Sequence, residues 1–141
     1  MTNPMIKFFS KLNVAVYRMT DGRWMGKFAN QDICIVRMRG AKSGEWKDVP
    51  LMYVPNGDGV VLVASLGGAP KNPVWYHNLV ANPDIEVTVR DTTRKLRARR
   101  ATAEEKKALW PRCVAAYPPY ADYQKKTTRD IPVFICDPRS A

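Results

Sequence analysis

From residue 31 onward, short apolar runs alternate with turn residues, which is the pattern of a strand-rich domain. Lys42-Ser43-Gly44 separates the first two runs, and Asn-Gly-Asp-Gly at 56–59 separates the next two, so both sites indicate tight turns. A further hairpin is expected to turn at Asp91-Thr92. The predicted strands cover residues 32–39, 46–55, 60–64, 85–90, 94–101 and 131–136.

Apolar residues at three- and four-residue steps predict helices in the remaining segments. Residues 5–19 form a basic amphipathic pattern that suits packing on the domain, which we favour, or lying on a membrane surface. A short helix is expected over residues 73–81, with Asn72 as its N-cap, Pro73 at its first position and Asn82-Pro83 at its end.

Thr102 and Glu105 have capping-box spacing, which places the start of a longer helix after the last hairpin. Pro111 is expected to kink or divide this helix, and Pro118-Pro119 to end it before a short second one. Its inward face is predicted to carry Leu109, Trp110, Cys113, Val114 and Tyr117. Tyr117, Tyr120 and Tyr123 follow at three-residue steps, which suits either core packing or an aromatic wall over a flat ligand.

The order of elements is helix, three strands, helix, two strands, two helices and strand. Strands joined mostly by hairpins predict an α+β fold, with an antiparallel sheet or small barrel and helices packed around it. The 141 residues suit one domain, 1–141, with an N-terminal helix and linker over 1–25 and the main body over 31–137. With no apolar run of membrane-spanning length and no signal-peptide pattern, we expect a cytoplasmic protein.

The charge adds a ligand class to this picture. A net charge of +10 favours a polyanion, such as nucleic acid, an acidic membrane or a multiply charged small molecule. Cys34, Cys113 and Cys136 have no metal or redox spacing and are expected to be small core residues. The lone His77 leaves a general base, a metal ligand and a structural residue open, although a metal site is disfavoured without a second ligand nearby.

Two loops are candidates for binding the anion. After the strand at 60–64, Gly67-Gly68, Lys71 and a helix start bring backbone N–H groups and a cation together, unless this is an ordinary strand-to-helix connection. Lys42 and Lys47 form a second cationic clamp, or else are solvated turn residues. The run 94–100 suggests nucleic acid, but we interpret Lys95, Arg97 and Arg99 as the solvated face of an edge strand.

No nucleophile pair or carboxylate pair of catalytic type is evident, so an enzyme of this sequence needs a cofactor for the difficult chemistry. The segments GAKSGEWKDVPLMYV, VASLGGAPKNPVWYHNLVANPDIEV, ARRATAEEKKALWPRCVAAYPPYADYQ and IPVFIC resemble the deazaflavin-dependent nitroreductase family of actinobacteria. This resemblance implies a split β-barrel and coenzyme F420, a deazaflavin with a phosphate and oligoglutamate tail. It also implies hydride transfer from the reduced coenzyme to a quinone, nitroaromatic or α,β-unsaturated ester.

The same resemblance implies the site residues. Tyr117, Tyr120 and Tyr123 would shape the acceptor pocket. A separate hypothesis is that the hydroxyl of Tyr120 or Tyr123 stabilises the developing oxyanion or relays a proton. Ala41 and Leu66 stand where many members have basic residues. The cofactor would be bound by Lys42, Ser43, Gly44, Lys47, Pro50, Val63, Ala64, Ser65, Gly67, Gly68, Ala69, Lys71, Asn72, Trp75, Tyr76, Asn78 and Leu79.

The expected partner is a small-molecule electron acceptor and no nucleic acid, with peripheral membrane contact through the N-terminal helix left open and the oligomeric state not predicted. The alternatives are an FMN-using relative or a non-catalytic carrier on the same barrel, and a basic nucleic-acid-binding domain.

Overall fold

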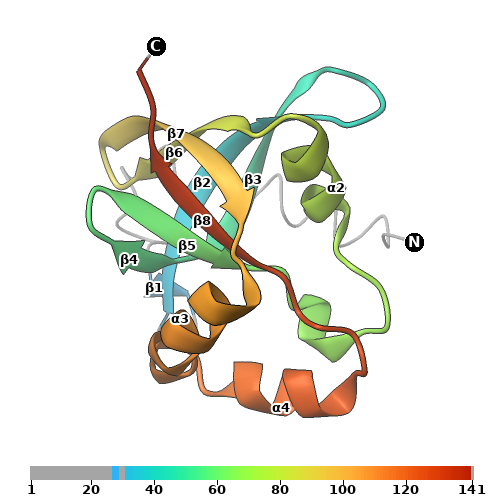
Figure 1. The fold of residues 1–141 in the computed structure, drawn as a ribbon. Coiled ribbons are helices and arrows are strands. Elements are labelled where there is room, and N and C mark those ends of the chain that lie inside the picture. Colours follow the sequence, from blue (N-terminus) through green and yellow to red (C-terminus); the bar gives the residue numbers. More distant parts are fainter. Residues whose placement is uncertain (1–26, 29–30, 141) are drawn as a thin grey trace.

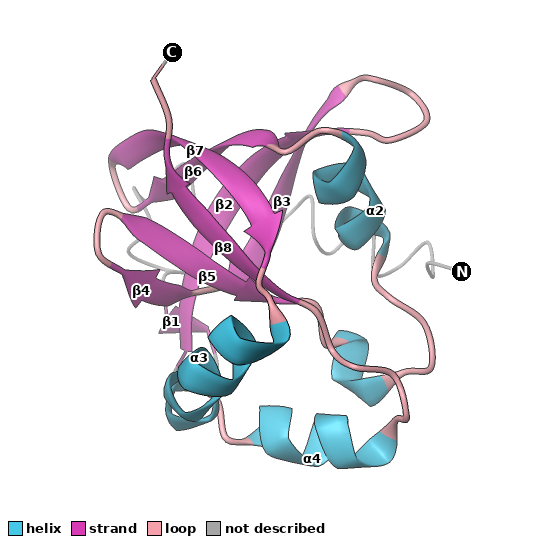
Figure 2. Ribbon diagram, in the orientation of Figure 1, coloured by secondary structure: helices cyan, strands magenta, loops and turns pink. Residues whose placement is uncertain are grey.

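The computed structural model describes residues 27–28 and 31–140, and the predicted helix over residues 5–19 lies outside them. The described chain forms one curled antiparallel sheet with helices at its margins (Figures 1 and 2). The strands are β1 Lys27–Phe28, β2 Gln31–Arg39, β3 Trp46–Met52, β4 Val54–Asn56, β5 Gly59–Val63, β6 Asp84–Val89, β7 Thr92–Arg100 and β8 Val133–Pro138. The helices are the 3₁₀ turn η1 Leu66–Gly68, α2 Val74–Ala81, α3 Ala103–Ala116 and α4 Pro119–Lys126.

The strand order is β1-β2-β6-β7-β8-β5-β4, and β3 pairs with β2. A single residue, Tyr53, separates β3 from β4, so the chain passes from one margin of the sheet to the other and the sheet curls into a partial barrel. The strand pairings of the described residues are all antiparallel, which confirms the predicted fold class.

The core consists of two clusters that share strand β5. Val60 and Leu62 point into the barrel interior, whereas Val61 and Val63 pack against α3 and α4. A strand covered on both faces needs a continuous apolar sequence, which is what Gly-Val-Val-Leu-Val provides. The three cysteines are all buried and unpaired, as expected of small core residues.

Several element boundaries differ from the sequence predictions. Helix α2 begins at Val74 with Pro73 as its N-cap, because the Asn72 side chain accepts a hydrogen bond from Arg129 instead of capping the helix. Pro111 lies inside α3, which continues undivided to Ala116. The β3 strand ends at Met52 rather than at residue 55.

The last hairpin also turns earlier than predicted, because Val89 pairs with Thr92 and leaves Arg90-Asp91 as the turn. Arg90 accommodates this turn with a positive φ of 56°. The closing strand starts two residues later than predicted, since the N–H of Ile131 donates to the side chain of Gln124 instead of joining the ladder.

The interpretation of β7 as an edge strand is wrong, because β7 pairs with both β6 and β8. Its outer cations are exposed, but two of them are bound by carboxylates. Arg97 Nε lies 2.7 Å from Asp84, and both terminal nitrogens of Arg99 donate to Glu105 at 2.8 and 2.9 Å. This neutralisation weakens the nucleic-acid interpretation of the basic run.

The topology brings three connections to one end of the barrel. In an antiparallel sheet of this order, β2, β5 and β7 run in the same direction, so their carboxyl ends share an end. The turn at 40–45, the loop at 64–73 and the start of α3 therefore all leave from that end. In the part of the chain that the structure describes, no helix is long and apolar enough to cross a membrane.

Candidate functional site

The loop after β5 has a backbone conformation suited to binding an anion. Ser65 is right-handed, with φ −77° and ψ −39°, and it is followed by positive φ angles of 44° at Leu66, 62° at Gly67 and 79° at Gly68. A right-handed residue followed by a left-handed one turns consecutive N–H groups toward a common point. Within residues 31–140, no protein acceptor is found for the N–H groups of Ser65, Leu66 and Gly67.

The two glycines of this loop have different surroundings. A Cβ atom added at Gly68 would lie 2.8 Å from the carbonyl oxygen of Tyr123 and 3.2 Å from Cβ of Lys126, so Gly68 allows α4 to approach the loop. A Cβ atom added at Gly67 would meet nothing within 4 Å. Gly68 therefore serves packing, whereas a Cβ atom at Gly67 would enter space that the described residues leave open.

The N-terminus of α2 adds to the positive character of the loop. Val74 and Trp75 begin the helix, and their N–H groups have no protein acceptor among the described residues. Lys71 is exposed three residues before the helix, and no carboxylate of the described chain forms an ion pair with it. Helix N-termini and cations both favour an anion at this place.

The turn at 40–45 is attached to α2 through buried Asn78. The Asn78 side-chain oxygen accepts from the N–H of Ala41 at 2.9 Å, and its nitrogen contacts Met38 Sδ at 3.6 Å. Asn82 adds a bond to the Gly40 carbonyl at 3.4 Å. The predicted cofactor residue Asn78 thus joins the turn to α2, which carries the second cationic turn toward the helix.

On that turn, Lys42 and Lys47 are exposed, and neither forms an ion pair in the described chain. Gly44 has a φ of 70°, and Ser43 accepts the N–H of Glu45 at 3.2 Å, so these two residues shape the turn itself. Pro50 stands further along β3, opposite Ile35.

Other predicted site residues contribute through packing. Leu79 and Ala64 are fully buried in the barrel core, and Val63 is buried against the tyrosines. The rings of Trp75 and Tyr76 lie 5.9 and 5.6 Å from that of Phe134, which anchors α2 to the sheet. Ala69 accepts two hydrogen bonds at its carbonyl, both from Arg129.

The three tyrosines form one cluster next to the glycine loop. The hydroxyls of Tyr117 and Tyr123 lie 3.3 Å apart, and the Tyr120 ring lies 5.0 Å from that of Tyr117. Tyr120 is buried, with 4% of its surface exposed, and this burial raises its pKa. The hydrogen bond with Tyr117 and, to a smaller extent, burial raise the pKa of Tyr123. Both phenols therefore stay protonated at neutral pH and can donate hydrogen bonds.

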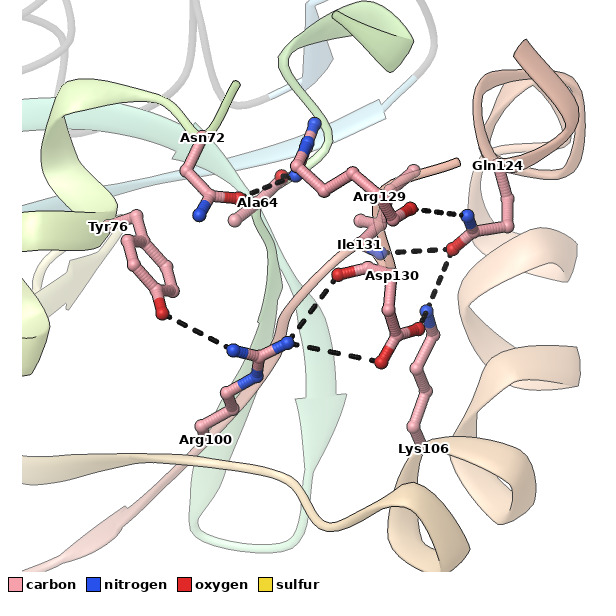
Figure 3. A network of polar contacts seen from close by, with 9 residues as sticks. All are labelled: Ala64, Asn72, Tyr76, Arg100, Lys106, Gln124, Arg129, Asp130 and Ile131. Atoms are coloured by element: carbon pink, nitrogen blue, oxygen red, sulfur yellow. Dashed lines mark hydrogen bonds and ion pairs between the residues drawn. The ribbon is translucent and has the colours of Figure 1, made fainter. Parts of the chain in front are cut away.

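Arg129 is a site residue that the sequence analysis missed. Its guanidinium donates five hydrogen bonds to the loop at 64–72, as Figure 3 shows in part. Arg129 stands alone in the TTRD connection between α4 and β8 and belongs to no motif. Nothing in its sequence context marks it, because its partners lie about 60 residues earlier in the chain.

Two further features of the chain carry no such chemistry. His77 is exposed and makes an edge contact with the ring of Tyr76, and the described residues contain no group of ligands that could hold a metal. A hollow of ≈ 330 Å³ lies at the opposite end of the barrel, beside the β4–β5 and β6–β7 turns, and none of the predicted site residues lines it. The donor chemistry therefore places the candidate site at the loop end.

Comparisons with known proteins identify the family of this chain. The family model described as F420H(2)-dependent quinone reductase matches residues 9–138. Two Mycobacterium tuberculosis proteins are similar to this chain. Rv3178, provisionally named an F420H(2)-dependent quinone reductase, is 40% identical over 74% of this chain and 88% of its own length. Rv1261c, named an F420H(2)-dependent quinone reductase, is 33% identical over 89% of this chain and 87% of its own.

Solved structures agree as well. An F420-H2 dependent reductase, FDR-A, is 46% identical with a TM-score of 0.70, over 74% of this chain and 93% of that one. The heme storage protein HutZ of Vibrio cholerae is 11% identical, with a TM-score of 0.57 over 93% and 91% of the two chains, and shows the fold alone. These neighbours confirm the predicted split β-barrel. Since the family model spans most of the sequence, the chain belongs to the F420H(2)-dependent quinone reductase family.

Proposed function

We propose that this protein reduces a quinone with F420H2 and that the loop at 64–73 binds the phosphate of the cofactor. Family membership supports the cofactor and the reaction class. The proposed position of the phosphate rests on the N–H groups of Ser65, Leu66 and Gly67, which lie near Lys71 and have no protein acceptor among residues 31–140. A phosphate accepts several such bonds at once, and bonds to an ionised acceptor are roughly twice as strong as neutral ones.

The residues present fit the chemical character of F420. Its tail carries a phosphate and several carboxylates, which require more than one cationic contact. The second turn offers Lys42 and Lys47, held near α2 by Asn78. Their contact with the carboxylates accounts for part of the net charge of +10 without nucleic acid.

When bound, F420H2 supplies the hydride, so the chain needs only to orient the reactants, exclude water and deliver a proton. We assign the proton or hydrogen bond to Tyr123, which is half-buried and shares a hydroxyl contact with Tyr117. Tyr120 packs behind them, since it is almost fully buried. A well-placed donor that stabilises the charge developing on a quinone oxygen raises the rate by about 10²–10⁴-fold.

Titration with F420, with FMN as control, tests the proposal directly. We expect micromolar binding of F420 and a clear preference over FMN. Lys71→Ala and Lys42→Ala should each weaken F420 binding by about 1–3 kcal/mol, whereas Lys95→Ala on the outer face of β7 should have little effect. FMN binding as tight as F420 binding would support the FMN-using relative, and binding without turnover would support the carrier.

The finer parts of the assignment are tested in the same preparation. Nitroaromatic and α,β-unsaturated ester acceptors are proposed alongside quinones, and turnover with each decides among them. We propose a single-domain cytoplasmic enzyme in which residues 5–19 provide any membrane contact. Sedimentation with anionic vesicles, compared with neutral ones, tests that contact.

A further inference from the structure

The Arg129 guanidinium uses all of its hydrogen-bond donors on one loop. A guanidinium has five N–H groups in a rigid plane. Here the five bonds reach three backbone carbonyls and one side-chain amide, all within residues 64–72. They are Nε to Ala69 O at 3.1 Å, Nη1 to Ala64 O at 3.0 Å and Asn72 Oδ1 at 2.6 Å, and Nη2 to Ser65 O at 2.8 Å and Ala69 O at 3.0 Å.

These bonds fix which way the loop presents its peptide groups. In a planar trans peptide the N–H points opposite to the C=O. Because the carbonyls of Ala64 and Ser65 point at Arg129, the N–H groups of Ser65 and Leu66 must point away from it. Those are two of the three N–H groups for which the described part of the chain offers no acceptor.

The charge of Arg129 is not cancelled locally. No carboxylate in the described part of the chain forms an ion pair with its guanidinium, which is surrounded by carbonyl oxygens instead. An arginine keeps its proton in proteins, so a full positive charge stays behind the loop. An anion on the far side of the loop is attracted by this charge as well as by the N–H groups.

Arg129 is itself held in place by its surroundings (Figure 3). Gln124 of α4 donates to the Arg129 carbonyl at 2.8 Å, and the Arg129 N–H donates to Thr127 at 3.2 Å. The Gln124 oxygen accepts from Lys106 at 2.8 Å, and Lys106 lies 2.6 Å from Asp130. The backbone that carries Arg129 is thus tied to α3 and α4 before any ligand arrives.

We propose that Arg129 is a positioning residue for the anion of the cofactor, acting through the loop at 64–72 rather than by contact. It holds the carbonyl side of the loop so that the N–H side is formed in advance. The identity of the anion as the F420 phosphate depends on the proposed function, whereas the role of Arg129 in shaping the donors does not. Lysine cannot replace it, because one ammonium with three donors cannot span these acceptors.

The test compares Arg129→Gln and Arg129→Lys with Arg112→Gln. Arg112 is a matched control, because it also donates to a backbone carbonyl, that of Pro55, and to an asparagine side chain, that of Asn56, but both lie in β4. Two probes are titrated: F420, and the deazaflavin riboside that lacks phosphate and tail. Urea unfolding of each variant establishes that it is folded.

We expect both Arg129 variants to bind F420 at least about tenfold more weakly, with the riboside changed by less than about twofold. Arg112→Gln should change neither. Equal weakening for both probes would overturn the proposal, because it would show a general structural role. Binding of F420 by Arg129→Lys at the wild-type level would also overturn it, because charge alone would then suffice.

A second measurement separates this inference from the proposed function. Inorganic phosphate is added to ¹⁵N-labelled protein, and the amide signals of Ser65, Leu66 and Gly67 are followed. Shifts in wild type that disappear in Arg129→Gln support the inference even if F420 itself fails to bind. No shift of these amides in wild type would refute it, whatever F420 does.

Discussion

Replacing each of the two adjacent loop glycines by alanine separates packing from ligand approach. Both substitutions place an alanine at a positive φ, of 62° at residue 67 and 79° at residue 68. This backbone conformation costs a residue with a Cβ atom about 1–2 kcal/mol. At Gly68 the new Cβ atom would also lie 2.8 Å from the carbonyl oxygen and 3.0 Å from Cα of Tyr123, and both are backbone atoms that cannot rotate away.

Overpacking against fixed atoms typically costs a further 1–3 kcal/mol, so Gly68→Ala should lose about 2–5 kcal/mol of unfolding free energy. Gly67→Ala should lose only about 1–2 kcal/mol, because its Cβ atom meets nothing within 4 Å. Urea unfolding at constant m-value measures both losses. F420 titration should show weaker binding by Gly67→Ala, because the added methyl group occupies the space beside the proposed phosphate donors.

We therefore expect Gly68→Ala to lose the most stability, and Gly67→Ala to lose less stability but to bind F420 poorly. Equal losses of stability in the two variants would refute the argument, since only Gly68 is close to α4. Normal F420 affinity in Gly67→Ala would show that the phosphate does not approach this face of the loop.

Three further results are expected. The bidentate bond from Arg99, together with the N–H of Thr102, lowers the pKa of Glu105 to about 2, so its contribution to stability is full above the unfolded value and declines as the pH falls toward 2. Glu105→Gln should thus lower the melting temperature at pH 7, by an amount that shrinks in acid. Tyr123→Phe should reduce turnover more than F420 affinity, whereas Tyr120→Phe should act mainly on stability, because Tyr120 is buried. The thiols of Cys34, Cys113 and Cys136 should resist a disulfide reagent until urea unfolds the protein, because burial raises their pKa values.

The elements predicted from local patterns were mostly correct. The capping box of Thr102 and Glu105 and the Asn-Gly-Asp-Gly turn depend on neighbours within a few residues, and both are found in the structure. The same holds for the buried strand that ends at Val63, because its apolar, mostly β-branched run favours a strand covered on both faces. Interactions of this range can be evaluated from the sequence alone.

Two of the predictions that failed depend on partners distant in the sequence. Asn72 has the side chain of a good N-cap, but a charged donor 57 residues away competes for its oxygen and wins. The β7 strand has the charged outer face of an edge strand, yet β8 covers that edge and the cations find Asp84 and Glu105. In both cases a partner distant in the sequence replaced what the local interpretation assumed, a helix N–H group for Asn72 and solvent for β7.

The same competition explains how the loop at 64–72 exists in its unusual form. Leu66 has a Cβ atom and a φ of 44°, a conformation that costs about 1–2 kcal/mol and that a free peptide would leave. The carbonyl of Ser65, the residue before it, accepts a hydrogen bond from the Arg129 guanidinium. The same guanidinium also donates to the Ala69 carbonyl and the Asn72 side chain further along the loop. Each bond to a charged donor contributes roughly 1.5–3 kcal/mol, so a few of them offset the strain. The strained shape is thus present before the ligand binds, and the anion does not have to supply the energy of forming it. In the proposed site, part of the affinity comes from a residue that need not touch the ligand, and a search restricted to the residues lining the site would leave Arg129 out.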